Sequence, residues 1–459
     1  MGRRRGVTLS GQEEAFGQES LVPRKGDVSM VSPQLREDLQ ALVGQWCREH
    51  CQVGTVAEAE QLAEQLSQAT GAAVVEALVP ATAGGASYDG SRRACAFGGT
   101  ARFVGYRQRG VGTLYGVVQV SRAYYHCQQC HRGQLPWDEQ QGLDARWWTP
   151  RVKALVTQVA ARLSFQETVD LLAETLGFVI EDSSADEIVT EVGGRLRGAQ
   201  TALMRQYEQG ELALQVAAAP RRLYVGMDGT SAHIDGGWHE VKVGLTYRGE
   251  PGDDGVDVAS ALRYVAAQEA SEAFGSRLYL LAAQAGVEQA EETVVIGDGA
   301  EWIWNLARHH YPGARQIVDY WHACEHIHKL ARAYYGEGNQ QGQRWAREHC
   351  RALQEKGPGK LLRALSRMRP QTPEQAEAVR TERGYFRRNR PRMEYRQFRA
   401  AGLMIGSGPV EAGCKVVVGQ RLKRAGMRWS GAGADAVLAA RAALLSGQSH
   451  LIAEAARAA

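Results

Sequence analysis

The sequence predicts an α/β protein in which a mixed sheet, covered by helices, follows a helical region and a β-hairpin. From about residue 222, strand-like apolar runs come first and then alternate with helical segments, as in RLYVGMD, WHEVKVGLTYRG, TVVIGDG and ARQIVDYW. Before them, apolar residues recur at helical spacing except in one β-rich stretch at 101–125. These observations predict a mostly helical N-terminal half and a C-terminal half built around a sheet.

Length and composition are those of a globular protein with more than one domain. A chain of 459 residues exceeds one ordinary apolar core, and its 44% hydrophobic and 23% charged residues exclude a disordered chain. No run approaches the roughly 20 apolar residues of a membrane helix, and the basic start lacks the apolar segment of a signal peptide. We therefore expect a cytoplasmic protein without a membrane partner.

The N-terminal part is expected to hold a tail, helices and a hairpin. Residues 1–35 are rich in Gly, Arg, Ser and Gln without periodicity, which predicts a disordered tail. Apolar spacing predicts helices between residues 33 and 76, and the alternation in RFVGYRQRGVGTLYGVVQVSRAYYH predicts a hairpin leading to a cysteine pair. Residues 36–140 are grouped as one region.

Residues 141–215 are predicted to form short helices joined by tight turns. The segments PRVKALVTQVAARL, SFQETVDLLAETLG and SADEIVTEVGGRL have helical apolar spacing. Ser164 and Ser184 are suited to begin helices, because Glu167 and Glu187 follow three residues later and complete capping boxes. The pattern is typical of a helix-turn-helix DNA-binding module, and a structural bundle is the alternative.

Two aspartates follow apolar strands and precede glycine. Asp228 is placed at the end of the strand RLYVGMD, and Asp298 follows TVVI with glycine on both sides. An ionised carboxylate is costly to bury alone, so each side chain is expected to face a cleft or a cation. Asp-Gly is first of all a turn signal, but two such residues at the carboxyl ends of separate strands indicate a site.

Glu411 is the third acidic residue of interest. It lies in MIGSGPVEAGCK, where Ser407 is suited to begin a helix and Pro409 to occupy its first turn. Lys415 is expected on the same face of that helix, as an ion-pair partner or as a phosphate ligand. The alternative is that Glu411 only complements the helix dipole.

Three carboxylates from distant positions suit a site for two divalent ions. Mg²⁺ and Mn²⁺ prefer hard oxygen ligands and leave positions for water and phosphate oxygens. Two ions about 3.5–4 Å apart stabilise the attacking and leaving oxygens of an in-line displacement at phosphorus. Such a site can cut a strand with water and join strands with a 3′-hydroxyl.

Several blocks of the chain resemble a known group of transposases. They include MDGTSAHIDGGWHEVKVG, IGDGAEWIWNLARHHYPGARQIVDYWHACEH and NRPRMEYRQFRAAGLMIGSGPVEAGCK with the residues that follow it to about 447. These blocks resemble the catalytic blocks of ISKra-group insertion-sequence transposases, which are distantly related to the Mutator-like group. The similarity reaches back to TLYGVVQVSRAYYHCQQC and so covers most of the chain beyond about residue 90.

The resemblance implies a fold and a triad. By it, residues 220–447 form a ribonuclease H-like catalytic domain with a helical insertion at about 325–400. Asp228, Asp298 and Glu411 match the motif positions of the DDE triad. In Mutator-like enzymes a Cys/His pair follows the second aspartate, so His322 or His326, in DYWHACEH, is expected to contact the scissile phosphate. A structural zinc site or simple core packing are the alternatives for that segment.

Basic residues gather between residues 380 and 428, opposed by three glutamates, and predict a phosphate-binding surface. Within it, the expected DNA-binding residues are Lys415, Arg421, Lys423, Arg424, Arg428 and Trp429. Trp429 is favoured over Trp302, Trp304 and Trp321 for stacking on bases, because it lies within the basic stretch. A solvated basic face is the alternative reading of the stretch.

A zinc site is expected near the hairpin. Cys127 and Cys130 in HCQQCH have the spacing of a zinc knuckle, which needs further ligands. Related transposases resemble this part with a C-x-x-C before the hairpin, where this chain has only Cys95, in RRACAFGG. His131 or His126 is the expected fourth ligand.

The sequence therefore predicts a DDE transposase that uses Mg²⁺ or Mn²⁺ to cut and join DNA at the inverted repeats of its own element. Residues 36–215 are expected to recognise the element ends. By the resemblance, the protein acts on target DNA as a homodimer or a larger synaptic assembly. Two alternatives remain open: a transposase-derived DNA-binding protein without catalysis, and a structure-selective nuclease of the same fold.

Overall fold

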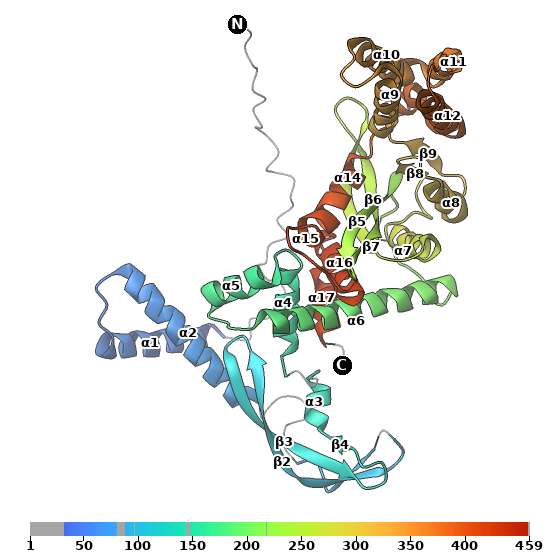
Figure 1. Cartoon of the computed structure of the whole chain (residues 1–459). Helices are drawn as coiled ribbons and strands as arrows, with labels where there is room; N and C mark the ends of the chain where they lie inside the picture. Colours follow the sequence, from blue (N-terminus) through green and yellow to red (C-terminus); the bar gives the residue numbers. More distant parts are fainter. Residues whose placement is uncertain (1–31, 80–87, 96, 144–146, 217, 458–459) are drawn as a thin grey trace. The chain divides into compact units, whose positions relative to one another are not determined.

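A computed structural model describes residues 32–79, 88–95, 97–143, 147–216 and 218–457 (Figure 1). Residues 1–31 of the predicted tail lie outside this set. The chain divides into two compact units, Met1–Ser67 and Gln68–Ala459. The first unit contains helix α1 (Pro33–His50) and the beginning of α2 (Val56–Leu78). Both helices fall where apolar spacing predicts them. None of the helices in the described ranges is both long and apolar enough to cross a membrane.

A four-stranded antiparallel sheet contains the predicted hairpin. Its order is β1-β2-β3-β4, and Thr113 at the end of one long strand pairs with Gly116 at the start of the next. Arg122 makes a buried ion pair with Asp138, with a nitrogen–oxygen distance of 2.7 Å, and so fixes the following helix to the sheet. The elements are β1 (Arg92–Ala94), β2 (Thr100–Thr113), β3 (Gly116–Cys127), β4 (Gly133–Gln134) and α3 (Pro136–Gln140).

Three helices follow, as predicted for residues 141–215. The capping box of Ser164 and Glu167 is present, with each side chain bonded to the other residue's backbone N–H. The box predicted at Ser184 is wrong: the helix begins two residues earlier, where the Asp182 carboxylate bonds the Ser183 N–H at 2.7 Å and complements the helix dipole. The helices are α4 (Pro150–Ala160), α5 (Phe165–Leu176) and α6 (Asp182–Glu208).

These helices share an apolar cluster with the C-terminal end of the chain. Ile188 and Val192 of α6 pack in one cluster with Ala440 of α16 (Gly431–Leu445) and Ile452 of α17 (Ser449–Arg457). The Arg197 guanidinium adds two bonds of 2.8 Å to the Asp435 carboxylate. The helical region therefore packs against helices that follow the central sheet in the sequence.

The central sheet has five strands in the order β7-β6-β5-β8-β9. The first three pair antiparallel, and β8 and β9 run parallel to β5. The predicted mixed α/β sheet is thus confirmed. The strands are β5 (Arg222–Ile234), β6 (Gly237–Pro251), β7 (Asp257–Ala267), β8 (Glu292–Gly297) and β9 (Arg315–Val318).

Helices cover both faces of this sheet (Figure 1). Gly244 of β6 lies against Leu278 of α7 (Ser271–Gln284), whereas its neighbour Val243 lies near Gly413, at the other face. Successive strand residues point to opposite faces, so apolar side chains are buried on both sides of the sheet. Helix α8 (Glu301–His310) connects β8 to β9.

Residues between β9 and the last helices form the predicted insertion. It begins at Tyr320, five residues before the predicted start, because Asp319 caps the first helix. The helix that begins after Ser407 is interrupted by a π-helical turn and by a non-helical stretch after Leu422. The elements are α9 (Tyr320–Tyr335), α10 (Gln340–Lys356), α11 (Gly359–Arg367), α12 (Pro373–Arg388), the 3₁₀ turn η2 (Arg390–Arg392), α13 (Tyr395–Ala400), α14 (Gly408–Gly413), the π-helix η3 (Cys414–Gly419) and α15 (Gln420–Leu422).

Candidate active site

Asp228 lies in β5, and Asp298 directly follows the neighbouring parallel strand β8. The last pair of the β5–β8 ladder joins Gly226 to Ile296, and each aspartate is two residues further along the chain. Adjacent strands are about 4.8 Å apart. Asp228 is not at a strand end as predicted, because β5 continues to Ile234 in its pairing with β6. Since β8 ends at Gly297, the edge of β5 beside Asp228 is open.

The two carboxylates repel each other, and each accepts a hydrogen bond from a backbone N–H group. Asp228 accepts a bond of 2.7 Å from the Gly229 N–H, and Asp298 accepts one of 2.7 Å from the Ala300 N–H. Burial raises the pKa of Asp228, and the charge of Asp298 raises it further. A half-buried acid whose ionisation is opposed by a neighbouring carboxylate belongs to a site that a cation would stabilise.

A thiol missed by the sequence analysis fills the space beside Asp228. The Cys414 Sγ lies 3.5 Å from Asp228 Oδ2 and can donate to it. Burial raises the pKa of Cys414, and the charges of Asp228 and Glu411 add to the rise. The thiol therefore stays protonated. Its place in the sequence, one helical turn after Glu411, was the signal that could have identified it.

Glu411 stands on the same face of the sheet as Asp228. Helix α14 packs on β5 through Val410, so closely that a Cβ on Gly226 would lie 2.3 Å from the Val410 side chain. Its neighbour Glu411 has a side chain 56% exposed, with one carboxylate oxygen 3.9 Å from the Lys415 amine. The structure thus places the third acid over the same strand, paired with the lysine that the helical spacing predicts.

Asp319 positions the segment that carries Glu411, a role that the sequence analysis did not assign. Its side chain is buried and accepts hydrogen bonds from the Ser407 N–H, the Ser407 hydroxyl and the His322 N–H. Ser407 precedes α14 as predicted, but its hydroxyl bonds Asp319 instead of capping that helix. The Tyr320 N–H also donates to the Ile405 carbonyl at 2.9 Å. The start of α9 and the approach to α14 are therefore fastened together.

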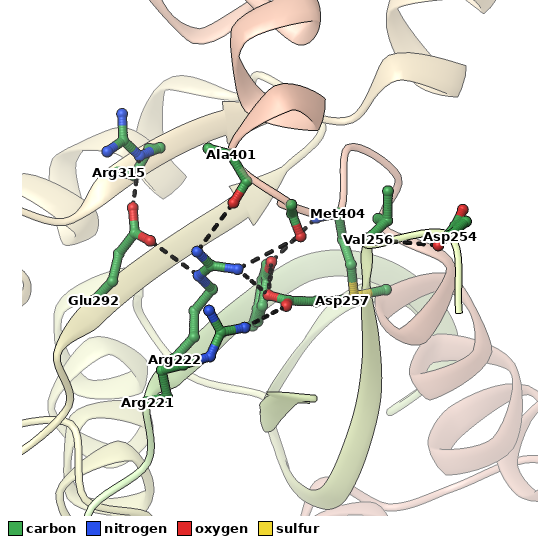
Figure 2. Close-up of polar contacts among 11 residues, drawn as sticks. Arg221, Arg222, Asp254, Val256, Asp257, Glu292, Arg315, Ala401 and Met404 are labelled. Atoms are coloured by element: carbon green, nitrogen blue, oxygen red, sulfur yellow. Dashed lines mark hydrogen bonds and ion pairs between the residues drawn. The ribbon is translucent and has the colours of Figure 1, made fainter. Parts of the chain in front are cut away.

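A second polar network holds residues 401–404, which precede α14 (Figure 2). Asp257 is buried and accepts from Arg222 at 2.6 Å and from the Tyr224 hydroxyl at 2.8 Å. Arg222 also donates to the Ala401 carbonyl, and the Met404 N–H donates to the Tyr224 hydroxyl. These bonds tie residues 401–404 to strands β5 and β7.

An open groove of about 530 Å³ lies between these two networks. Glu411 and Pro409 line it together with Met404 and Trp321. Trp321 is 64% exposed, which is unusual for so large an aromatic ring. The groove therefore offers a flat apolar surface beside the third carboxylate.

The insertion reaches the site through α12. The Tyr385 hydroxyl donates to the Asp298 carbonyl at 2.8 Å, and the Asn389 amide lies 3.5 Å from the Gly299 carbonyl. Gly299 has a φ of 104°, and Tyr385 occupies the space in which a side chain at that position would lie. The turn after β8 is thus held by the insertion.

His322 and His326 lie together at the start of the insertion. Their Nε2 atoms are 3.3 Å apart, and His326 Nδ1 lies 2.6 Å from the Glu382 carboxylate of α12. Burial raises the pKa of Asp228, and the charge of His322 opposes this rise. His326 stacks on Tyr385 with ring centres 3.9 Å apart.

The expected DNA-binding residues divide into exposed and buried groups. Lys415, Lys423 and Arg428 are exposed, and the Lys423 amine bonds the Thr230 hydroxyl, two residues after Asp228. Arg421 is 0% exposed, lies between the Phe165 and Trp429 rings and donates to the Ala160 carbonyl at 2.8 Å. Trp429 is 7% exposed and donates to the Leu422 carbonyl. Arg424 pairs with Glu167 of α5. Burial thus removes Arg421 and Trp429 from any DNA surface.

Three cysteine sulfurs converge at the base of the small sheet. The ligand atoms of Cys95, Cys127 and Cys130 all lie within 4.8 Å of one another, and Cys95 and Cys130 are 3.5 Å apart. Backbone N–H groups of Cys130 and Gln129 lower the pKa of Cys127. The expected fourth ligand His131 is not in this group and has a φ of 56°. Three soft thiols fit zinc, which requires one further ligand.

A family model matches most of the chain. The model of an uncharacterised protein family, UPF0236, matches residues 99–456, more than half of the chain. No curated protein matches at significant similarity. The matched region includes the hairpin, the central sheet, the three acids and the insertion.

Proposed function

The chain belongs to the uncharacterised protein family UPF0236, and from that membership and the site we propose that it is a DNA transposase, a DDE enzyme that cuts and joins the ends of an insertion sequence. The observation that carries the proposal is that Asp228 lies in β5 and Asp298 directly follows the adjacent parallel strand β8, with Glu411 on a helix packed over β5. Three antiparallel strands followed by two parallel ones support a ribonuclease H-like assignment of the central sheet.

The residues present fit Mg²⁺ or Mn²⁺. Asp228, Asp298 and Glu411 would hold the ions. Burial and the charge of Asp298 raise the pKa of Asp228, and a bound cation would oppose both effects. Bound ions would supply Lewis-acid activation of the attacking water or 3′-hydroxyl and of the leaving oxygen. The thiol of Cys414 donates to Asp228 and so orients that carboxylate.

Lys415 and Lys423 would bind phosphates of the substrate strand. Lys415 lies 3.9 Å from Glu411, and Lys423 reaches Thr230 beside the first acid. A phosphate that draws Lys415 away would leave Glu411 free to turn toward the other two acids. Arg428 extends this exposed basic surface, and Trp321, in place of the buried Trp429, offers its ring to an unpaired base. Residues 36–215 would recognise the element ends, and two or more copies would hold both ends and the target DNA.

The proposal is tested with purified full-length protein and DNA carrying the element's terminal repeat. Asp228→Asn, Asp298→Asn and Glu411→Gln are expected to bind this DNA normally and to lose Mg²⁺-dependent nicking and strand transfer. Glu301→Gln is the matched control, because it removes an exposed carboxylate three residues after Asp298. Nicking retained by Asp228→Asn would refute the assignment.

The pairing of Glu411 with Lys415 gives one specific reason to consider a chain that binds DNA without cutting it. Terminal DNA bound by the wild-type chain with no cleavage in Mg²⁺ or Mn²⁺ would favour that function. Cleavage without strand joining would instead favour a structure-selective nuclease.

For the small sheet we propose a zinc site held by Cys95, Cys127 and Cys130. A ligand from outside the three-cysteine group would complete the coordination. The ion would link the turn after β1 to the turn after β3, which the sulfur positions already bring together.

A further inference from the structure

A line of polar side chains in the helical insertion runs from Glu382 through His326 to His322. We infer that Glu382 and His326 are positioning residues that orient the His322 ring, so that its Nδ1 is the nitrogen presented to a phosphodiester of the DNA strand. The inference rests on the proposed function, because it names the partner of that same site. By this inference α12 has two roles: it stabilises the fold, and through Glu382 it positions a residue that contacts the substrate.

Glu382 is the first member of the line. Its side chain is only 3% exposed, among apolar neighbours of α12 such as Phe386 and Val379. A carboxylate in such surroundings requires a partner. The His326 Nδ1, at 2.6 Å, is much closer than the Lys329 amine, at 3.9 Å on a side chain that is 70% exposed. His326 is therefore the hydrogen-bond partner of the buried carboxylate.

The hydrogen-bond directions follow from Glu382. An ionised carboxylate can only accept, so His326 carries a proton on Nδ1. In the neutral ring Nε2 then has a lone pair, and it faces His322 Nε2 at 3.3 Å. His322 must donate through Nε2, which leaves its Nδ1 for another partner. Stacking on Tyr385 holds the His326 ring in this orientation.

The remaining nitrogen of His322 faces an accessible region. Its nearest charged neighbour is Glu325, whose carboxylate is 3.5 Å away on a side chain that is 77% exposed. A pocket of about 550 Å³ opens here, with basic residues from the same face of α9. A proton on Nδ1 would be donated to a non-bridging phosphate oxygen, and the hydrogen bonds from Glu382 through His326 orient the ring for this contact. The pocket is lined by His322, Glu325, His326, His328, Lys329 and Arg332.

Helix α12 connects this line to the acids by a second route. Tyr385 stacks on His326 and bonds the carbonyl of Asp298. The charged groups that act on the histidine pair and on Tyr385 come from three sources. They are Glu325 and Lys329 on α9, Glu382 on α12, and Asp228, Asp298 and Asp319 at the sheet edge. A shift of α12 would move the histidines and the Asp298 turn together.

The first test reads the ring protons directly. Full-length protein labelled with ¹⁵N-histidine is studied by long-range proton–nitrogen spectra without metal, and His322→Gln and His326→Gln assign the signals. We expect His326 in the Nδ1–H form, which is the less common neutral tautomer in water, and its preference to be lost in Glu382→Gln. An Nε2–H form of His326 in the wild-type chain overturns the inference, whether or not any variant folds.

The second test separates chemistry from binding. Glu382→Gln is expected to lower the single-turnover rate of nicking roughly tenfold or more and to leave the affinity for terminal DNA unchanged. Glu377→Gln, on the exposed side of α12 and paired with Arg380, is the matched control and should keep the wild-type rate. A wild-type rate in Glu382→Gln contradicts the inference. Absence of nicking by the wild-type chain would instead refute the proposed function, while the spectra still decide the tautomer.

Discussion

Asp228 is a residue whose folded environment opposes its own charge. Burial and the neighbouring Asp298 both raise its pKa, so the folded chain holds this proton more tightly than the unfolded chain does. Stability from this group is present at low pH and is lost as pH rises through the raised pKa. Without bound metal, the ionised pair therefore weakens the fold near neutral pH.

Neutralising Asp228 is expected to stabilise the metal-free protein. Asp228→Asn removes the repulsion and should raise the free energy of unfolding by about 0.5–2 kcal/mol at pH 8, as is common when a strained functional group is replaced. The gain should disappear in acid, where the wild-type aspartate is protonated. Thermal unfolding in chelator at both pH values measures it. Added Mg²⁺ should stabilise the wild type only, and equal stabilisation of both proteins would contradict the role of Asp228.

Single residues were predictable where their signal is local. Asp228 and Asp298 stand next to glycine after apolar runs, and Glu411 sits where Ser407 and Pro409 start a helix. Asp319 has no such signal, because its partner Ser407 is 88 residues away in the sequence. Glu382 looks like any glutamate on a polar helix until the fold places His326 beside it.

At the scale of elements, the basic segment after Glu411 contains both a buried residue that stabilises the fold and an exposed residue that is available to a ligand. Arg421 is inserted between aromatic rings and bonds the carbonyl of Ala160, at the C-terminal end of α4, where a cation also complements the helix dipole. Burial lowers the pKa of Arg421 to about 10, which leaves it charged at neutral pH. Lys423, two residues later, is exposed near Thr230.

The two residues should therefore respond to different measurements. Arg421→Ala is expected to cost about 1.5–3 kcal/mol of folding stability, as for a lost hydrogen bond to a charged group. Lys423→Ala should leave stability within about 0.5 kcal/mol but reduce the salt dependence of DNA binding by about 0.9 in the log–log slope. Chemical denaturation and binding titrations at several salt concentrations measure both. A changed slope without lost stability in Arg421→Ala would contradict its structural role.

The small sheet should depend on its cysteine cluster. Cys127→Ser is expected to abolish bound zinc and to increase hydrogen exchange in β1, β3 and β4, because the cluster joins the turns beside those strands. Exchange in the central sheet should not change. Cys47→Ser, in α1, is the control for loss of a thiol. Metal analysis of the purified protein that finds no zinc, with unchanged exchange in Cys127→Ser, would rule the site out.

Element types were easier to predict than element ends. Apolar spacing placed helices α4, α5 and α6, and alternation placed the β2–β3 hairpin. Strand β5 was expected to stop at Asp228, since Asp-Gly usually marks a turn. Twelve paired positions with β6 instead carry it through to Ile234. Cross-strand pairing, which depends on a second segment, overrides the local turn preference.

At the scale of the whole molecule, helices from separate parts of the sequence share one apolar cluster. Residues 141–215 and 220–447 were separated in the sequence analysis because their periodicities differ. In the structure Ile452 of α17, beyond that range, joins the apolar cluster of α4 and α6. Periodicity shows which face of a helix is apolar, but it does not show which element that face will contact.

This sharing predicts a long-range effect of a C-terminal substitution. Ile452→Ala is expected to lower stability by about 2–5 kcal/mol and to increase hydrogen exchange in α4, more than 290 residues earlier in the chain. Glu454→Ala, on the exposed side of the same helix, should change neither. Exchange that rises only within α17 would show that the two regions are energetically independent.

The fastening of Tyr320 to Ile405, and of Asp319 to Ser407, brings the two ends of the insertion together at one point of the sheet. A segment whose ends already meet can lengthen or shorten at a small entropic cost, since closure depends only weakly on loop length. Family members could therefore carry very different numbers of residues between the second and third acids while keeping the same distance between them in space. The spacing of the acids along a sequence would then be a poor guide to membership of the family. A hydrogen-bonded acid and hydroxyl where the two ends of the insertion meet, such as Asp319 and Ser407, would be a better guide.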